Sequence, residues 1–213
     1  MHTKLNPEKA LIFRIVHRVN VSWILSHGIY CRNSTIQDPS YRTIGNPELI
    51  EKRRSRDVPI PPAGVLSDYV PFYFTPFSPM MYKIKSGHGG MTKVPNEDVV
   101  IFVSSLYKIE AAQIPYVFTD SHAYLQTAQF YNKLSDLSEI DWPLLRSKDF
   151  KHDSDDPGKF ERYQAEALVH KHVPVEAFIG AVCYTDGVKD SLMQIVEAKG
   201  LELKVVKQTG WYF

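Results

Sequence analysis

One carboxylate interrupts an apolar run late in the chain. Glu166 lies in RYQAEALV (162–169), two residues after Gln164 and four after Arg162. If this segment is a strand, these three polar side chains and Leu168 share one face, and Tyr163, Ala165, Ala167 and Val169 share the other. If it is a helix, Arg162 and Glu166 lie at positions i and i+4, where they could pair. The strand interpretation predicts that Glu166 faces a cleft, with small neighbours that leave room for a ligand.

A cluster of cations follows a strong helix start in NPELIEKRRSR (46–56). Asn46 is a preferred N-cap residue, and Pro47 suits the first helical position. The helix is expected to end in four cations, Lys52, Arg53, Arg54 and Arg56. Such residues complement the negative end of the helix dipole, so a solvated face is one interpretation. Because guanidinium groups bind phosphate through parallel hydrogen bonds, a phosphate site is the other.

The segment DYVPFYFTPFSPMM (68–81) is aromatic and β-prone. Alternation along a strand places Phe72 and Phe74 together in the core. It turns Tyr73 to the opposite face, where the ring could stack on a flat ligand. Pro71 argues that this strand lies at a sheet edge or starts late, since proline cannot donate a ladder hydrogen bond.

Four features together suit one class of ligand. They are His17, which closes the first expected strand, the arginine cluster, Tyr73 and Glu166. Guanidinium groups bind phosphates, an aromatic ring stacks on a flat base, and a carboxylate stabilises developing positive charge. Recognition of a dinucleotide with a cationic glycosidic bond needs these groups, and the pattern makes it one hypothesis among several.

Other common sites have weaker support. His170 and His172 form the only close histidine pair, and the sequence has no HExxH or Cys/His framework, so no metal site is expected. SGHGG (86–90) matches neither Walker A nor GxGxxG, which favours a flexible loop. The sequence contains no GxSxG motif, so a serine hydrolase is poorly supported. A two-carboxylate glycosidase is disfavoured because a strand would place Glu161 and Glu166 on opposite faces.

The pattern of elements predicts an α+β fold. Apolar β-prone runs predict strands at 11–16, 68–75, 98–104, 115–119 and 179–185, with closing strands at 201–206 and 210–213. Capping and stop residues predict helices at 20–28, 46–55, 78–87, 120–132 and 186–200. Roughly six to eight strands and four or five helices without strict alternation favour α+β over a doubly wound parallel fold. The loops 84–98 and 146–161 are long enough to be functional or mobile.

The composition bounds the class of protein. The chain has 213 residues, which suits one domain over residues 1–213. Its net charge of +1 excludes a strongly basic nucleic-acid binder, so any nucleic-acid surface must come from local clustering. The two cysteines, Cys31 and Cys183, are far apart, and the chain shows neither a signal peptide nor a membrane-spanning run. We therefore expect a soluble, cytoplasmic protein.

Six segments carry a resemblance to a known family: RIVHRVNVSWILSHGIYCRNS, IGNPELIEKR, DYVPFYFTPFSPM, PYVFTDSHAY, KFERYQAEALV and GWYF. In order and spacing they resemble the DarT family of DNA ADP-ribosyltransferase toxins. The resemblance implies the ADP-ribosyltransferase fold, a split, strongly bent β-sheet core with short helices around a NAD cleft. It implies transfer of ADP-ribose from NAD⁺ to a base of single-stranded DNA, thymine in the better-known branch. It also implies a macrodomain antitoxin, DarG, that removes the modification and binds the toxin.

The resemblance further implies roles for individual residues. Arg53 matches the essential arginine, beside the NAD phosphates and the reacting base, and Glu166 matches the catalytic glutamate. Four residues match the NAD pocket beside the ribose and nicotinamide: His17, Asn33, Ser34 and Tyr73. Met80 and His122 look like contacts to the target strand. The loop before Glu166 resembles the substrate-recognising loop of this fold, so the expected cationic DNA contacts are Lys148, Lys151, Lys159 and Arg162, with Arg54 and Arg56 near the NAD side. We expect NAD⁺ as co-substrate, no metal, and a monomer.

The implied reaction leaves one step open. Glu166 near the ribose hydroxyls would stabilise the positive charge that develops at the ribose C1. Arg53 would hold the pyrophosphate and position the base, but a guanidinium stays protonated and cannot take the proton from the thymine ring nitrogen. Glu166 or water could take it. Two alternatives are an enzyme of the same fold that acts on RNA or protein, and a non-catalytic nucleic-acid-binding module.

Overall fold

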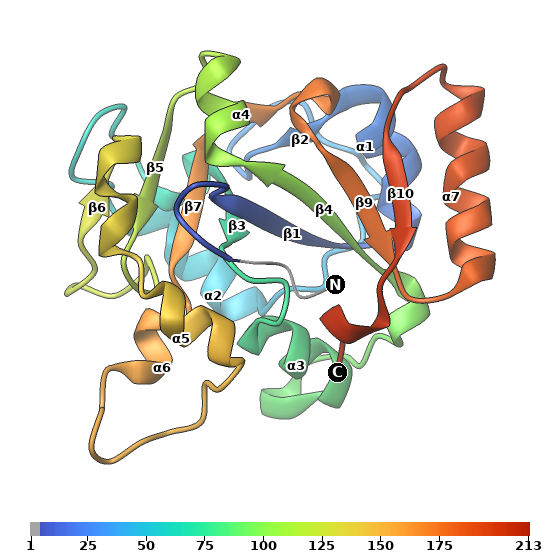
Figure 1. Ribbon diagram of the computed structural model, residues 1–213. Coiled ribbons are helices and arrows are strands. Elements are labelled where there is room, and N and C mark those ends of the chain that lie inside the picture. Colours follow the sequence, from blue (N-terminus) through green and yellow to red (C-terminus); the bar gives the residue numbers. More distant parts are fainter. Residues whose placement is uncertain (1–4) are drawn as a thin grey trace.

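The computed structural model describes residues 5–213 and is built around one eight-stranded sheet (Figure 1). The strand order is β10-β9-β4-β1-β3-β7-β5-β6. The bounds are β1 Leu11–His17, β3 Tyr69–Tyr73, β4 Val99–Ser105, β5 Tyr116–Thr119, β6 Phe130–Tyr131, β7 Glu166–His170, β9 Gly180–Cys183 and β10 Lys204–Lys207. A second, two-stranded sheet pairs β2 (Ile29–Tyr30) with β8 (His172–Val173). Strands β9 and β10 are parallel and the other pairs antiparallel, so the predicted α+β class is confirmed.

Short helices surround this sheet, and the longest one, α7, lies beside β9 and β10 (Figure 1). The α-helices are α1 Val21–His27, α2 Pro47–Lys52, α3 Pro79–Ser86, α4 Leu106–Ala111, α5 Trp142–Ser147, α6 Lys159–Arg162 and α7 Asp186–Ala198. The 3-10 helices that concern the site are η1 Arg18–Asn20, η2 Arg53–Ser55 and η3 Leu66–Asp68. None of the helices within residues 5–213 is long and apolar enough to cross a membrane.

Helix starts follow the predicted capping chemistry. The Asn46 side chain accepts hydrogen bonds from the first backbone N–H groups of α2, and Pro47 occupies the first turn. Ser78 caps α3 in the same way, ahead of Pro79. These two caps fix where α2 and α3 begin, and with them the positions of the cluster of arginines after α2 and of Met80 in the first turn of α3.

The sheet divides between β1 and β3. Strand β1 pairs with β4 over its whole length, from Leu11 to His17, but with β3 only at Phe13 and Tyr73. Beyond that one pair the strands diverge, and the Arg14 side chain spans the gap by donating from Nη1 to the Pro71 carbonyl oxygen at 3.0 Å. The expected split of the core sheet therefore lies at the β1–β3 junction.

Both expectations drawn from Pro71 are wrong. Strand β3 is not at a sheet edge, because it lies between β1 and β7, and it does not start late, because it begins at Tyr69, ahead of the proline. On one side, β3 pairs with β7 along its length, with Pro71 opposite Leu168. The Pro71 carbonyl points across the divergence to Arg14, and in an extended strand the position of the missing N–H points the same way. The proline is tolerated because that side of β3 has lost its ladder partner.

Two predicted elements are wrong. Residues 120–129 form turns rather than a helix, and only Phe130 and Tyr131 are extended. Asp120 does not cap a helix: its Oδ1 accepts from the Ser121 hydroxyl and from the Gln129 backbone N–H, which closes a loop. The C-terminal GWYF is not a strand: Gly210 and Trp211 belong to the 3-10 turn η8 (Thr209–Trp211), and Tyr212 and Phe213 are irregular. The two-residue strands β2, β6 and β8 were not predicted.

Candidate active site

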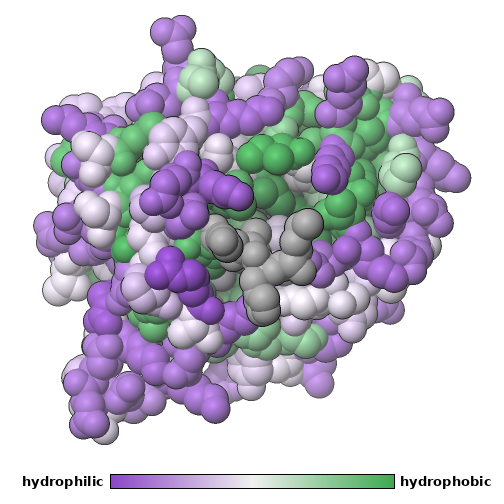
Figure 2. Space-filling view, viewed as in Figure 1, coloured by the Kyte–Doolittle hydropathy of each residue, from purple (hydrophilic) through white to green (hydrophobic). Residues whose placement is uncertain are grey.

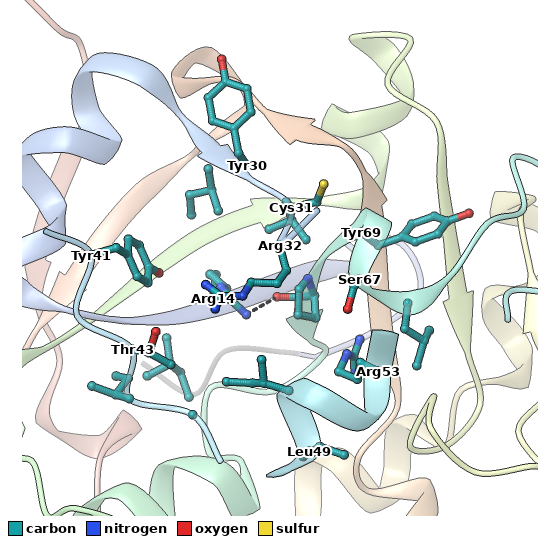
Figure 3. Close-up of a pocket in the computed structure, with 18 of the residues that line it drawn as sticks. Arg14, Tyr30, Cys31, Arg32, Tyr41, Thr43, Leu49, Arg53, Ser67 and Tyr69 are labelled. Atoms are coloured by element: carbon teal, nitrogen blue, oxygen red, sulfur yellow. Dashed lines mark hydrogen bonds between the residues drawn. The ribbon is translucent and has the colours of Figure 1, made fainter. Parts of the chain in front are cut away.

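A cavity with a volume of about 460 Å³ opens where β1 and β3 diverge (Figure 3). Its walls come from β1, α1, β2, the segment 37–53, β3 and β7. The lining residues with polar or aromatic side chains that matter below are Arg14, Cys31, Arg32, Arg53, Tyr73, His122 and Glu166. This volume lies in the range of cavities that hold small-molecule ligands.

A buried ion pair forms part of the cavity lining. Arg53 Nη1 donates to Glu166 Oε2 at 2.9 Å and to Oε1 at 3.2 Å, and the residues are 9% and 3% exposed. The backbone N–H of Ala123 donates a further hydrogen bond to Oε1 at 3.2 Å. Arg53 Nη2 is buried, yet within residues 5–213 it has no hydrogen-bond partner. A buried donor without a partner is costly, so this atom points to a ligand that would complete it.

Strand register places Tyr73 beside this pair. Tyr73, the last residue of β3, lies directly opposite Glu166, the first residue of β7, so both side chains share a face. Burial, and next the charge of Glu166, raise the pKa of Tyr73 well above its usual range, so its hydroxyl stays protonated. That hydroxyl lies 3.7 Å from the Met80 sulfur in α3.

The strand predicted over 162–169 is wrong in its first half. Residues 159–162 form α6, a turn follows, and β7 starts only at Glu166. Arg162 does not face the cleft. It forms a two-pronged pair with Asp156, at 3.0 and 2.7 Å, and contacts Asp141 at 3.3 Å. The hydrogen bond with Asp156 is the main reason that the pKa of Arg162 is raised.

His122 lies in the cavity next to Glu166. Its Nε2 is 3.9 Å from Glu166 Oε1, and its side chain is 14% exposed. Burial lowers the pKa of His122 below its ordinary value; the charge of Glu166 opposes this, and that of Arg53 adds to it. The ring is therefore neutral near pH 7 and can accept a proton.

His17, Asn33 and Ser34 lie outside the lining of the cavity. His17 ends β1, accepts the Val19 N–H on Nδ1 and is 1% exposed, and its Nε2 has no partner among the described residues. Asn33 contacts Asp68, and the Ser34 hydroxyl accepts the N–H of Ile36. Their roles in NAD binding stay predictions.

Several of the expected DNA-binding cations are engaged within the protein. Arg56 donates to the Leu125 carbonyl at 2.8 Å and to Gln126, so it fastens the loop that carries His122. Lys148 donates to the Gly210 carbonyl at 3.1 Å. Lys159 pairs with Asp149 at 2.7 Å. Arg54 is exposed and contacts Glu51, while Lys151 is exposed. Hydrophilic side chains crowd the projecting loop between α5 and α6 (Figure 2).

Two cavity arginines were missed by the sequence interpretation. Arg14 lies on β1, and the Arg32 side chain reaches down toward it from the segment after β2 (Figure 3). Within residues 5–213 neither forms an ion pair, and the buried Nε of Arg14 has no hydrogen-bond partner. The sequence does contain a signal for Arg14, because it is a charged residue inside the apolar run LIFRIV. Glu166 was singled out by the same kind of pattern.

Comparison with known proteins decides the family. The model of a family described as "ssDNA thymidine ADP-ribosyltransferase, DarT" matches residues 13–213. The chain belongs to the DarT family. A DNA ADP-ribosyl transferase of Escherichia coli O127:H6 is 52% identical over 209 residues, which cover 98% of this chain and 96% of that protein. One from Thermus sp. strain 2.9 is 34% identical over 214 residues, covering 97% and 98%.

Solved DarT structures share the fold. Thermus sp. 2.9 DarT in complex with ADP-ribosylated ssDNA superposes with a TM-score of 0.89 at 33% identity, covering 97% of this chain and 98% of that one. The same DarT in complex with NAD⁺ gives a TM-score of 0.86 at 33% identity, covering 97% and 99%. The ADP-ribosyltransferase fold expected from the DarT resemblance is thereby confirmed. Within residues 5–213 no group of three His, Cys, Asp or Glu side chains is placed to hold a metal ion.

Proposed function

We propose that this protein transfers ADP-ribose from NAD⁺ to thymine in single-stranded DNA and releases nicotinamide. Membership of the DarT family supports the reaction class, and the relative's complexes with NAD⁺ and with ADP-ribosylated ssDNA support both substrates. The observation that carries the proposal is the buried Arg53–Glu166 pair in the lining of the cavity. Residues 1–213 would form one catalytic domain, of which the first four lie outside the described residues.

The residues of the cavity suit NAD⁺. Glu166 would lie against the nicotinamide ribose and stabilise the positive charge that develops as the nicotinamide bond breaks. Arg53 would hold this carboxylate in place through Nη1 and offer the unpartnered Nη2 to the ligand. The ring of Tyr73, opposite Glu166, would pack against the nicotinamide.

Arg14 and Arg32 would take the pyrophosphate. Arg53 was expected to do so, but its Nη1 is occupied by Glu166, whereas Arg14 and Arg32 have no carboxylate partner within the described part of the chain. Both guanidinium groups line the same cavity, and an anion bound between them would offset their mutual repulsion. A diphosphate supplies that charge and accepts paired hydrogen bonds from both.

Replacing Arg14 or Arg32 by glutamine should weaken NAD⁺ binding. Each charge-assisted contact contributes about 1.5–3 kcal/mol, which corresponds to a rise in KM of about tenfold or more. Initial rates at varied NAD⁺ concentration and saturating DNA measure this change. Arg18→Gln is the matched control, because Arg18 follows β1 directly but pairs with Asp98 at the surface. An unchanged KM in both cavity variants would place the pyrophosphate elsewhere.

The DNA strand would approach along α3. Lys83 lies one turn after Met80, so both share a face of this helix, and the charge of Lys83 contributes to lowering the pKa of His122. Within residues 5–213 Lys83 has no acidic partner, unlike Lys159 and Arg162 of the expected substrate loop. Cations that are not already neutralised bind phosphate more strongly, because no internal pair has to be broken.

Lys83→Gln should therefore weaken binding of single-stranded DNA more than Arg162→Gln does. Loss of one phosphate contact should also reduce the slope of log affinity against log salt by about 0.7. Fluorescence anisotropy with an oligothymidine at several salt concentrations gives both quantities. If Arg162→Gln weakens DNA binding more than Lys83→Gln does, the phosphate contact lies in the loop between α5 and α6.

One experiment tests the reaction itself. The protein is incubated with labelled NAD⁺ and, in parallel, single-stranded DNA with and without thymine, RNA, and protein. Label is expected only on thymine-containing DNA, with nucleoside mass spectrometry identifying the modified base. Label on RNA or protein instead would favour the alternative enzymes of this fold, and no label on any acceptor would favour the non-catalytic module.

The biological setting follows from the family and is also a proposal. The protein would act as the toxin of a toxin–antitoxin system in the cytoplasm, as a monomer, and a macrodomain antitoxin would reverse its product. Induced expression in a bacterial host should arrest growth, and co-expression of a macrodomain antitoxin should restore it. Growth arrest that persists in an inactive Glu166 variant would contradict a catalytic toxin.

A further inference from the structure

Attack by thymine leaves one proton without an assigned acceptor. In DNA the thymine N1 carries the deoxyribose, so N3–H is the ring N–H that must lose its proton when nitrogen attacks the ribose C1. The residues that line the cavity close to Glu166 decide which group can take it. This question rests on the proposed function.

Arg53 and Glu166 are both poorly suited as the acceptor. A guanidinium stays protonated in proteins, so Arg53 cannot act as a base. The Glu166 oxygens already accept from Arg53 at 2.9 and 3.2 Å and from the Ala123 N–H at 3.2 Å. Its negative charge is also needed at the ribose, where the positive charge develops. Protonating Glu166 during attack would remove that charge when it is required.

Two other groups of the cavity are protonated at neutral pH. Burial, followed by the charge of Glu166, raises the pKa of Tyr73, so its hydroxyl is a donor there. Burial raises the pKa of Cys31, whose thiol is protonated for the same reason. Neither can receive a proton from N3 before losing its own.

His122 has the required chemistry and position. It lines the cavity, its side chain is only 14% exposed, and its Nε2 lies 3.9 Å from Glu166 Oε1. The backbone on either side is fixed: the His122 N–H donates to the Glu161 carbonyl at 3.0 Å, and the next N–H, of Ala123, holds Glu166. The reacting ribose, placed against Glu166, would therefore lie within reach of the imidazole.

We propose that His122 is the general base that removes the N3 proton of the target thymine. The N3–H bond breaks and its proton forms a bond to an imidazole nitrogen. The electron pair left on N3 forms the bond to the ribose C1, and the C1–nicotinamide bond breaks with its electrons moving to the pyridinium ring. Neutral nicotinamide leaves, and the imidazolium later gives its proton to water, so atoms and charge balance.

The charges around His122 favour this role. Glu166 on β7 lies beside the ring and would stabilise the imidazolium once it forms. Arg53 on η2 and Lys83 on α3 act in the opposite sense and, with burial, keep the resting imidazole neutral, while Glu161 on α6 opposes them weakly. The ring is thus unprotonated before attack and has a carboxylate neighbour after it.

The first test changes the proposed base and also the acidity of the substrate N3–H. His122→Gln should lower kcat for transfer to a thymine oligonucleotide by about 10²-fold or more at pH 7. A 5-bromouracil oligonucleotide is nearly isosteric with thymine, and its halogen makes N3–H more acidic. Because the proton then leaves more easily, the deficit of the variant should narrow severalfold with 5-bromouracil. An equal deficit on both substrates would mean that His122 only positions the strand.

The second test needs no variant. For the wild-type enzyme, kcat/KM should fall with decreasing pH along a limb that matches the pKa of His122 in the free enzyme, measured by NMR of ¹³C-labelled histidine. Because burial lowers the pKa of His122, this limb should lie at lower pH than for a histidine exposed to water. An acid limb that does not match the NMR titration would overturn the assignment.

Matched controls separate this inference from the reaction as a whole. His170→Gln alters another histidine of lowered pKa, which lies on β7 but outside the cavity lining. For this variant the ratio of the rate with thymine to the rate with 5-bromouracil should equal the wild-type ratio. If wild-type protein fails to modify thymine DNA, the proposed function fails. If wild type is active and His122→Gln retains its full rate with a normal unfolding transition, only the general-base assignment fails.

Discussion

Glu166→Gln is expected to abolish transfer of ADP-ribose while leaving the protein folded. Glutamine keeps the size of the side chain and an oxygen that can accept from Arg53 and from the Ala123 N–H. It removes the negative charge that would stabilise the developing positive charge at the ribose. Removal of one such electrostatic contact in an enzyme lowers kcat by about 10²–10³-fold, and a full charge should cost at least that much.

The measurement is the rate of transfer from labelled NAD⁺ to a thymine oligonucleotide, with thermal unfolding recorded in parallel. Glu176→Gln, a surface substitution on η7 (Val175–Ala177), is the matched control and should change neither quantity. A folded Glu166→Gln protein that keeps more than about a tenth of wild-type activity would remove Glu166 from the catalytic machinery.

Arg53→Met should have the largest effect on stability. It leaves the Glu166 carboxylate buried at 3% exposure without its cation. Breaking a buried ion pair from one side costs about 3–5 kcal/mol, because the remaining charge is no longer compensated. The variant should also be inactive, since Glu166 would lose its fixed orientation.

A double variant distinguishes the two consequences. Arg53→Met combined with Glu166→Gln removes both charges, so most of the lost free energy of unfolding should return while transfer stays absent. Urea unfolding of the wild type, both single variants and the double variant completes the cycle. If the double variant is less stable than Arg53→Met alone, the charge of Glu166 is not what destabilises the single variant.

Local patterns in the sequence predicted much of the fold. The apolar runs at 11–16 and 98–104 are strands β1 and β4, and the caps Asn46 and Ser78 start α2 and α3. These features depend on neighbours within a few residues. The failures have the opposite cause: Asp120 resembles a helix cap locally, but its side chain is satisfied by Gln129 nine positions later.

The site likewise combines features that depend on neighbours in the sequence with features that depend on distant residues. Glu166 and Arg53 could be singled out from residue type, yet their pairing joins positions 113 residues apart and depends on the registers of the central strands. The sequence interpretation placed Arg162 beside Glu166 because it continued strand alternation through 162–165, where the chain is in fact α6 and a turn. It missed Arg14 as a cavity residue, because the divergence of β1 from β3 is invisible in either strand alone.

Because β1 and β3 pair only at Phe13 and Tyr73, the sheet consists of two halves joined by a hinge at this pair. We call these halves leaves: one contains β10, β9, β4 and β1, and the other contains β3, β7, β5 and β6. One leaf carries Arg14, and the other carries Tyr73 and Glu166. A small tilt between the leaves would widen or narrow the cavity without breaking any ladder within either leaf. A dinucleotide that contacts Arg14 at its phosphates and Glu166 at its ribose would span both leaves and fix the angle between them. The substrate would then set the width of its own site, and binding of NAD⁺ should protect backbone amides near the hinge from hydrogen exchange.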